Sequence, residues 1–357
     1  MNAMAAMLAS ASMLLINQLQ YIGSHNSYHA GFGPAETEVW KQTAPQDFAS
    51  LDYSHPSVTR QLDDGVHQIE LDVYADSKGG LYSQPAINEL VAKAGLPADP
   101  PFADPTIMQK PGFKVMHMED VDQRSNCQPF TACLEQVREW SNRHPRHLPL
   151  FILVETKEDP LKVKFPTVTP ERFNTTSLDA LDAEIRSVFP RRQYITPDDV
   201  RGHYPTVNLA IRTKGWPSLN AARGKILFLL DQRKVSAAYL KGHPALRGRV
   251  MFTNSTPGEP DAAFVERNEG PASEITSLVR EGYLVRARTD AELKEAKSND
   301  TRRRDAMMSS GAQLLSTDFP RNEGADTGYV VEFAGAANVR CNPVLSGNHC
   351  RGADLHD

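Results

Sequence analysis

The chain has 357 residues, of which 40% are hydrophobic and 23% charged, and its formal net charge is −5. This composition supports a sizeable core and excludes wholesale disorder. The densest basic run is Arg302 to Arg304, inside a predicted helix, so the sequence does not indicate nucleic acid as a partner. The charge balance does not indicate strong attraction to an anionic membrane either.

The start of the chain is apolar and rich in small residues, and it contains no Lys or Arg, whereas a secretory signal normally begins with positive charge. We interpret residues 1–17 as a lead-in: a trimmed leader, a remnant of cloning, or the segment before the first strand. Asn17, Gln18 and Gln20 interrupt any membrane-spanning pattern, and no other stretch is both long and apolar enough. We therefore expect no transmembrane segment.

Short apolar runs bounded by turn residues recur along the chain and predict β-strands. Eight of them appear, at 18–23, 67–74, 113–118, 149–156, 225–231, 249–255, 282–288 and 312–318. The Pro-rich stretches at 97–112 and 160–170 are typical of loop insertions.

Helical patterns alternate with these runs. Residues 133–140 and 177–189 carry apolar side chains at helical spacing. Thr289 and Glu292 form a capping-box pattern for a helix that Gly311 would end. Eight strands with helices between them predict an α/β fold, a closed TIM-type (β/α)8 barrel with loop insertions, although a doubly wound sheet requires a similar pattern.

The four cysteines form two close pairs, Cys127 with Cys133 and Cys341 with Cys350, in loop-like sequence. Neither pair has CxxC spacing, which argues against a zinc site. We favour two local disulfides in an exported protein, with four free thiols in a cytosolic protein as the alternative.

Polar and ionisable residues gather at the C-terminal ends of the predicted strands, which is where barrel active sites are built. In chain order they are His25 and Asn26, Glu70 and Asp72, His117, Glu155 and Lys157, Asp231, Asn254, Arg286 and Arg288, and Asp318.

Some of these side chains are predicted to bind a metal. Glu70 and Asp72 are two residues apart and flanked by apolar residues, so in a barrel both acids would face the lumen, together with Glu155. Three like charges need a compensating cation, and oxygen ligands that include the Asn26 carbonyl favour Ca²⁺ or Mg²⁺. The alternatives are a solvated strand face for the first two acids and a simple ion pair between Glu155 and Lys157.

Taken together, these motifs resemble the catalytic region of phosphoinositide-specific phospholipases C, and most closely the Ca²⁺-dependent bacterial and fungal type. The resemblance runs through nearly the whole chain and implies a barrel of the phospholipase C-like phosphodiesterase kind. It is carried by GSHNSYH (23–29), LDYSHP (51–56), IELDV (69–73), KVMHME (114–119), HPRHLPLFILVETK (144–157), LRGRVMF (246–252), STDFP (316–320) and RCNPV (340–344).

The resemblance implies that His25 and His117 are the catalytic histidines and that Lys157 contacts the substrate phosphate. It also implies that Ca²⁺ is bound by Asn26, Glu70, Asp72 and Glu155. Gly23 would relax the backbone where the first strand ends.

The region of the second histidine departs from the family pattern. The segment between Asp72 and His117 is long and Pro-rich, and Met118 replaces the glycine that follows the histidine in the eukaryotic enzymes. Asp120 or Asp122 could therefore contribute in place of His117.

The expected reaction begins with attack of an inositol hydroxyl on phosphorus, which displaces diacylglycerol and forms a cyclic inositol phosphate. One histidine would remove the hydroxyl proton and the other would protonate the departing oxygen or stabilise the phosphoryl oxygens, because imidazoles titrate near neutral pH. Lys157, with Arg286 or Arg288, would add positive charge. The rivals are a glycerophosphodiester or sphingolipid phosphodiesterase on the same barrel, and a non-catalytic protein that binds a phosphorylated ligand.

These observations together set the expected organisation of the protein. We expect residues 18–357 to form a single catalytic barrel domain with a C-terminal extension that bears a disulfide. The protein would be a secreted or extracytoplasmic monomer that meets its phosphoinositide lipid peripherally, at a membrane or micelle surface. Loops bearing Phe32, Trp40 or Trp216 are the candidates for that contact.

Overall fold

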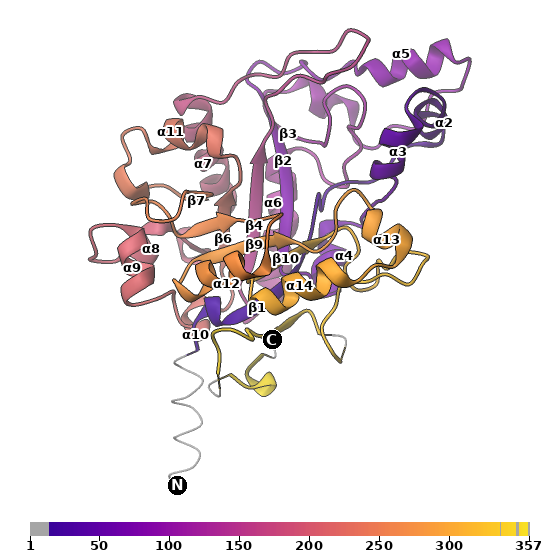
Figure 1. Cartoon of the computed structure of the whole chain (residues 1–357). Helices are drawn as coiled ribbons and strands as arrows, with labels where there is room; N and C mark the ends of the chain where they lie inside the picture. Colours follow the sequence, from indigo (N-terminus) through magenta and orange to yellow (C-terminus); the bar gives the residue numbers. More distant parts are fainter. Residues whose placement is uncertain (1–13, 336, 348–349, 356–357) are drawn as a thin grey trace.

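The computed structural model of the protein describes residues 14–335, 337–347 and 350–355. Its centre is a ring of eight parallel strands (Figure 1). In ring order they are β1 (Leu19–Ser24), β2 (Gln68–Asp76), β4 (Leu150–Thr156), β6 (Ile226–Leu230), β7 (Phe252–Thr253), β8 (Phe264–Glu266), β9 (Leu284–Arg288) and β10 (Leu314–Thr317). The predicted barrel is confirmed.

The ring is uneven. β2 and β4 pair over six residues, whereas β1 and β2 share one registered pair, Gly23 with Gln68. Between β7 and β8 a single bridge, Asn254 with Phe264, closes the circle. The barrel is therefore distorted, with its most regular wall at β2, β4 and β6.

The apolar runs that form these strands are buried on both faces, because the lumen lies on one side and the helices on the other. In β6 all five residues are buried, and in β4 only Glu155 is partly exposed. In β2 the acids Glu70 and Asp72 are fully enclosed between apolar neighbours. The sheet thus places carboxylates inside the barrel instead of on a solvated face.

Two of the predicted strands need correction. The run 113–118 forms β3 (Gly112–Val115), which pairs antiparallel with β2 through Val73 and Val115 and lies outside the ring. The barrel strand that the sequence analysis missed is β8, only three residues long. A buried hairpin strand has the same apolar pattern as a barrel strand, and a three-residue strand is too short to show periodicity. The predicted number of eight strands is therefore correct, but β3 was counted in place of β8.

Helices surround the ring. The predicted helices at 133–140 and 177–189 are observed as α6 and α7, somewhat longer than predicted. The α-helices are α2 (Pro34–Thr43), α3 (Pro45–Leu51), α4 (Val58–Asp63), α5 (Ala86–Lys93), α6 (Phe130–Arg143), α7 (Thr175–Val188), α8 (Pro197–Arg201), α9 (Val207–Thr213), α10 (Leu219–Ala222), α11 (Arg233–Leu240), α12 (Ala272–Arg280), α13 (Lys294–Ser298) and α14 (Arg302–Ser310).

The helix predicted to begin at Thr289 is wrong in its first half. Glu292 and Leu293 have positive φ angles of 51° and 59°, and the chain forms two helices, α13 and α14, in place of one. Thr289 is buried and bonds to Asp290 and to the Ser316 carbonyl instead of capping a helix. Gly311, with φ 84°, ends α14 as predicted.

Two features lie outside the barrel wall (Figure 1). At the end toward which β2 points, α2, α3 and α5 form a lobe whose α2 and α5 share a small apolar cluster of Ala35, Val39, Ile87 and Val91. At the opposite end, β11 (Val339–Cys341) pairs antiparallel with β1. Both predicted disulfides are present, Cys127 with Cys133 and Cys341 with Cys350.

The segment predicted as a lead-in lies largely outside the described residues. Of its last four residues, Leu14 and Ile16 are buried in the main core, and Leu15 bridges to Ser218. None of the helices in the described part of the chain has both the length and the apolar character needed to cross a bilayer.

Candidate active site

The first predicted histidine is held by a carboxylate from the other side of the ring. His25 follows β1, and its Nδ1–H donates to Oδ1 of Asp318, just beyond β10, at 2.7 Å. Arg288 Nη2 donates to the other Asp318 oxygen at 2.9 Å. This leaves His25 Nε2 free to face the lumen, where it lies 3.6 Å from Oε1 of Glu70.

Gly23 is required here for a different reason from the one predicted. It does not adopt a positive φ, so conformational freedom is not its role. A Cβ at this position would lie 2.4 Å from Oε1 of Gln68, on the neighbouring strand. The glycine lets β1 and β2 approach closely and so brings His25 next to Glu70.

The second predicted histidine is also bound to an aspartate. His117 lies on the loop after β3, and its Nδ1–H donates to Oδ2 of Asp122 at 2.8 Å. The same carboxylate accepts from Nε2–H of His29, which lies 3.0 Å from both oxygens. Asp120 has a different task, because it accepts the backbone N–H groups of Ala86 and Val168 and so fixes the loops.

The predicted metal ligands converge. One carboxylate oxygen from each of Glu70, Asp72 and Glu155 lies within 4.8 Å of the others. Lys157 Nζ lies 3.3 Å from Asp72 Oδ2 and 3.3 Å from Glu155 Oε1. Neither oxygen of the fully buried Asp72 has a well-formed hydrogen-bond partner among the described residues.

Asn26 is buried beside this cluster in a left-handed conformation, φ 45°, which Asn tolerates better than most residues. Its Nδ2 donates to the Tyr53 hydroxyl at 2.8 Å, and its Oδ1 accepts from the Tyr28 hydroxyl at 3.4 Å. The Tyr28 hydroxyl also interacts with Asp72. Tyr28 therefore connects Asn26 to the carboxylates.

The two predicted arginines are buried and bound to acids. Arg286 pairs with Glu70 on one side and Glu266 on the other. Arg288 pairs with Asp318 and, at 3.3 Å, with Asp290. Lys157 is the more accessible cation, with about a quarter of its side chain exposed.

The charges of the lumen are out of balance without a further cation. Burial raises the pKa of Glu70 to about 7, against the lowering effect of Arg286, and burial also raises the pKa of Asp72 and Asp231 above their usual range. Burial, together with the positive charge of Arg288 and Arg286, lowers the pKa of His25. The carboxyls resist ionisation because burial and mutual repulsion outweigh the nearby positive charge.

These residues fit a hard divalent cation. The donors are oxygens, they are preassembled and mostly buried, and no well-formed hydrogen bond from the described residues satisfies either oxygen of Asp72. Oxygen-only ligand sets of this kind suit Ca²⁺.

The site opens to the surface on two sides. His117, Glu155 and Lys157 line a cavity of about 300 Å³. Tyr53 and Asp318 line another of about 610 Å³. One member of each histidine–aspartate pair, His117 in the first case and Asp318 in the second, therefore borders a space that opens to the surface.

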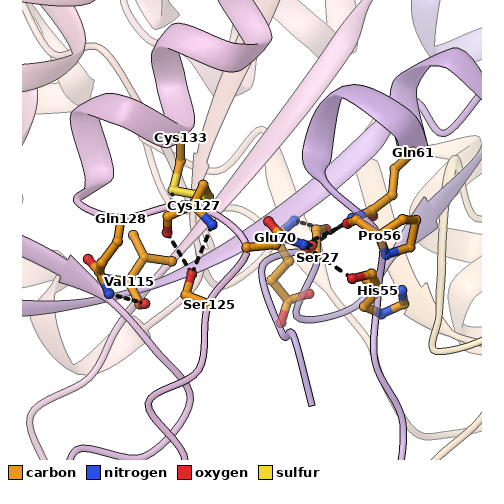
Figure 2. The surroundings of a disulfide bond; sticks show 11 residues. Ser27, His55, Pro56, Gln61, Glu70, Val115, Ser125, Cys127, Gln128 and Cys133 are labelled. Carbon is orange, nitrogen blue, oxygen red and sulfur yellow. Dashed lines mark hydrogen bonds between the residues drawn. A yellow bond between two sulfur atoms is a disulfide. The ribbon is translucent and has the colours of Figure 1, made fainter. Parts of the chain in front are cut away.

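A network behind the site joins it to the Cys127–Cys133 disulfide (Figure 2). Ser27 Oγ accepts the backbone N–H of Glu70 at 2.8 Å, and the Gln61 side chain donates to the carbonyls of Ser27 and Pro56. Asn126, adjacent to the disulfide, donates to the same two carbonyls. The loop that carries Asp122 is thereby fastened to the turn that carries His25.

Several residues of the site were not predicted. His29 lies in the same GSHNSYH motif as His25, so the motif itself was the available signal. Tyr53, whose ring centroid is 4.7 Å from that of His29, lies in LDYSHP. Glu266 had no signal, since it ends the strand that was missed.

The aromatic residues suggested for membrane contact are not exposed anchors. Trp216 is buried against Phe252, and its Nε1 donates to the Gly282 carbonyl. Phe32 and Trp40 are partly buried and pack on each other, with their ring centroids 5.7 Å apart.

Comparison with known proteins agrees with this geometry. The model of one family, phosphoinositide phospholipase C, Ca²⁺-dependent, matches residues 14–343. The chain therefore belongs to this family of calcium-dependent enzymes. Among curated protein sequences none is significantly similar to the chain.

Solved structures share the fold at low identity. One is a calcium-dependent phosphoinositol-specific phospholipase C from Pseudomonas sp., 17% identical, with a TM-score of 0.57, covering 94% of this chain and 97% of its own. Another is the Ca²⁺-dependent phosphatidylinositol-specific phospholipase C of Streptomyces antibioticus, 19% identical, with a TM-score of 0.53, covering 85% and 95%. At such identities the likeness shows the fold, and the roles of individual residues must be argued from the site.

Proposed function

We propose that this enzyme cleaves phosphatidylinositol-type lipids into diacylglycerol and a cyclic inositol phosphate, with His25 as the base and His117 as the acid. The observation that supports this most is the shared arrangement of the two imidazoles. Each has its Nδ1 bound to an aspartate, Asp318 or Asp122, which leaves Nε2 for the substrate. Both lie at the end of the barrel where the buried carboxylates converge.

His25 suits the role of the base. Burial and the charges of Arg288 and Arg286 lower its pKa, so its Nε2 is unprotonated near neutral pH. It would take the proton of the attacking inositol hydroxyl as the new oxygen–phosphorus bond forms. Asp318 then stabilises the imidazolium and keeps the ring oriented.

His117 suits the role of the acid. Its Nδ1–H is bound by the ionised Asp122, whose pKa the neighbouring histidines lower below its usual range despite burial. Burial outweighs this partner and leaves the pKa of His117 below its usual value, so the role of Asp122 is to stabilise the imidazolium that the reaction requires. His117 would give the Nε2 proton to the diacylglycerol oxygen as the phosphorus–oxygen bond breaks.

The calcium ligands are proposed to be Asn26, Glu70, Asp72 and Glu155, as predicted. When bound, Ca²⁺ would favour ionisation of the attacking hydroxyl and offset charge on the phosphate. Lys157, at the edge of the same cavity, is placed to contact a phosphate oxygen.

The predicted arginines add positive charge to the same lumen. Arg286 and Arg288 are each already paired with two carboxylates. They therefore contribute more by holding Glu70 and Asp318 in place than by contacting the substrate phosphate.

The setting of the reaction is also part of the proposal. Two disulfides fit an oxidising compartment, so we infer that the protein acts outside the cytoplasm. It would meet its lipid peripherally, with residues 18–357 as one catalytic unit and as a monomer.

Two substitutions test the histidine assignments. His25→Ala and His117→Ala should each reduce kcat by at least about 10²-fold, the range of a lost acid or base. Circular dichroism and calcium calorimetry should show that folding and metal binding are kept. Wild-type turnover by a folded His25→Ala protein would reject the assignment.

A further inference from the structure

Both proposed catalytic histidines belong to a three-membered chain. On one side the order is His25, Asp318 and Arg288. On the other it is His117, Asp122 and His29. The outermost member is a permanent cation in one case and a second imidazole in the other.

His29 is placed to act on Asp122. It is fully buried, and its Nε2 lies 3.0 Å from each oxygen of the carboxylate. Its ring centroid is 5.9 Å from that of His117 and 4.7 Å from that of Tyr53, so the ring is fixed by packing. Its backbone N–H donates to the Asn26 carbonyl at 2.8 Å, which ties it to the turn after β1.

Asp122 needs such a partner because of where it lies. It belongs to the loop between β3 and α6, where Met118 and Asp122 form only an isolated bridge. Its side chain has no solvent exposure, and among the described residues the hydrogen bonds to its carboxylate come from the two histidines. A buried carboxylate with a single hydrogen-bond donor could rotate about its Cβ–Cγ bond, and one of its oxygens would be left without a hydrogen bond.

We propose that His29 is a positioning residue that holds the Asp122 carboxylate so that Oδ2 receives Nδ1–H of His117, which keeps Nε2 of His117 directed at the leaving oxygen. This inference rests on the proposed role of His117 as the acid. It assigns His29 a role in kcat and not in substrate or calcium binding.

The alternative is that His29 only satisfies a buried carboxylate for the sake of stability. The two cases differ in what happens to His117. A positioning residue loses its effect when His117 is absent, whereas a general loss of stability or packing acts on any variant.

The experiment compares His29→Phe, which keeps a ring but removes the donor, with His29→Gln, which keeps an N–H donor. His147→Phe is the matched control, because His147 is also fully buried and bonds to Ser141 at a distance from the site. Each is measured for kcat, KM and calcium affinity, and the Phe change is also made in a His117→Ala background. The ring nitrogens of His117 are followed by ¹⁵N NMR in the calcium-loaded protein.

We expect His29→Phe to lower kcat by about 10- to 100-fold, typical of a group that orients an active residue through another. KM and calcium affinity should change less than twofold, His29→Gln should recover part of the loss, and the double variant should be no slower than His117→Ala alone. The ¹⁵N shift of Nδ1 should show that the hydrogen bond of His117 to Asp122 is weakened or lost.

The proposal is overturned if folded His29→Phe keeps kcat within twofold of the wild type. It is also overturned if the loss of kcat in His29→Phe multiplies with the loss in His117→Ala. The same holds if His29→Phe lowers kcat no more than the His147→Phe control does. Should the wild type fail to cleave phosphatidylinositol, the ¹⁵N signal of His117 Nδ1 still reports whether His29 holds Asp122 against His117. Failure of this inference and failure of the proposed function are therefore separable.

Discussion

Nδ1 of His25 lies 2.7 Å from Oδ1 of Asp318, while Nε2 of the same ring lies 3.6 Å from Oε1 of Glu70. One imidazole thus joins β10, through the residue that follows it, to a carboxylate on β2. The acid that orients the histidine and the acid proposed to bind calcium lie on opposite sides of one ring. The proposed base and the proposed metal site are therefore a single structural unit.

The first prediction concerns that orientation. Asp318→Asn should keep the shape of the site but allow the wrong tautomer of His25, so kcat should fall by about 10²- to 10⁴-fold. Calcium affinity, measured by calorimetry, should change little. Asp182→Asn is the control, since Asp182 is a buried aspartate bonded to Tyr239 instead of to a site residue. A loss of kcat no larger than in that control would contradict the role of Asp318.

The second prediction concerns Asp72. Without metal its charge is buried beside Glu70 and Glu155 and raises the free energy of the folded state. Asp72→Asn should therefore raise the melting temperature in chelator but remove most of the stabilisation that calcium gives the wild type. Differential scanning calorimetry with and without calcium measures both effects. Equal calcium-induced shifts in the two proteins would exclude Asp72 as a ligand.

The third prediction is the pH dependence of calcium binding. Burial raises the pKa of Glu70 to about 7, so near neutral pH part of the metal-free protein carries a proton that calcium must displace. Because the carboxylate binds and the acid does not, calcium affinity should rise as pH increases through 7. Calorimetry in two buffers of different ionisation heat should detect proton release at pH 6.5. Affinity independent of pH between 6 and 8 would contradict this account.

The fourth prediction separates the two disulfides. Each closes a short loop worth about 2 kcal/mol of unfolding free energy in the chain-entropy view. Only Cys127–Cys133 lies beside Asn126, which fastens the Asp122 loop to the turn bearing His25. Cys341 pairs with Leu19 at the start of β1, at the opposite end of the barrel.

Replacing both cysteines of the first pair by serine should therefore lower kcat as well as stability. The same change at Cys341 and Cys350 should lower stability alone. Thermal unfolding and kcat are measured for both double variants. Similar losses of kcat in the two would count against the link between the first disulfide and the site.

The fold and much of the site could be predicted because the signals are local. Strands buried on both faces are continuous apolar runs, and acids at alternate positions of such a run, as at Glu70 and Asp72, have only the lumen to face. The motif GSHNSYH then indicated the family and with it the histidines. The helix at 177–189 followed from its spacing alone.

What could not be predicted depends on contacts between distant segments. β3 has the pattern of a barrel strand, and only its pairing with β2 removes it from the ring. His117 bonds to Asp122, and Arg286 pairs with Glu266. The fold brings these partners together, and their spacing in the sequence does not predict the contacts. Gly23 was correctly singled out, but its close contact with Gln68 belongs to the packing of two strands.

The most direct test of the central claim is to incubate the enzyme with phosphatidylinositol and, separately, with phosphatidylcholine in mixed micelles, with calcium and with a chelator, and to follow products by ³¹P NMR. The account predicts a cyclic inositol phosphate from phosphatidylinositol only when calcium is present, and no cleavage of phosphatidylcholine. Cleavage that persists in chelator, or no inositol phosphate under any condition despite calcium binding, would contradict it.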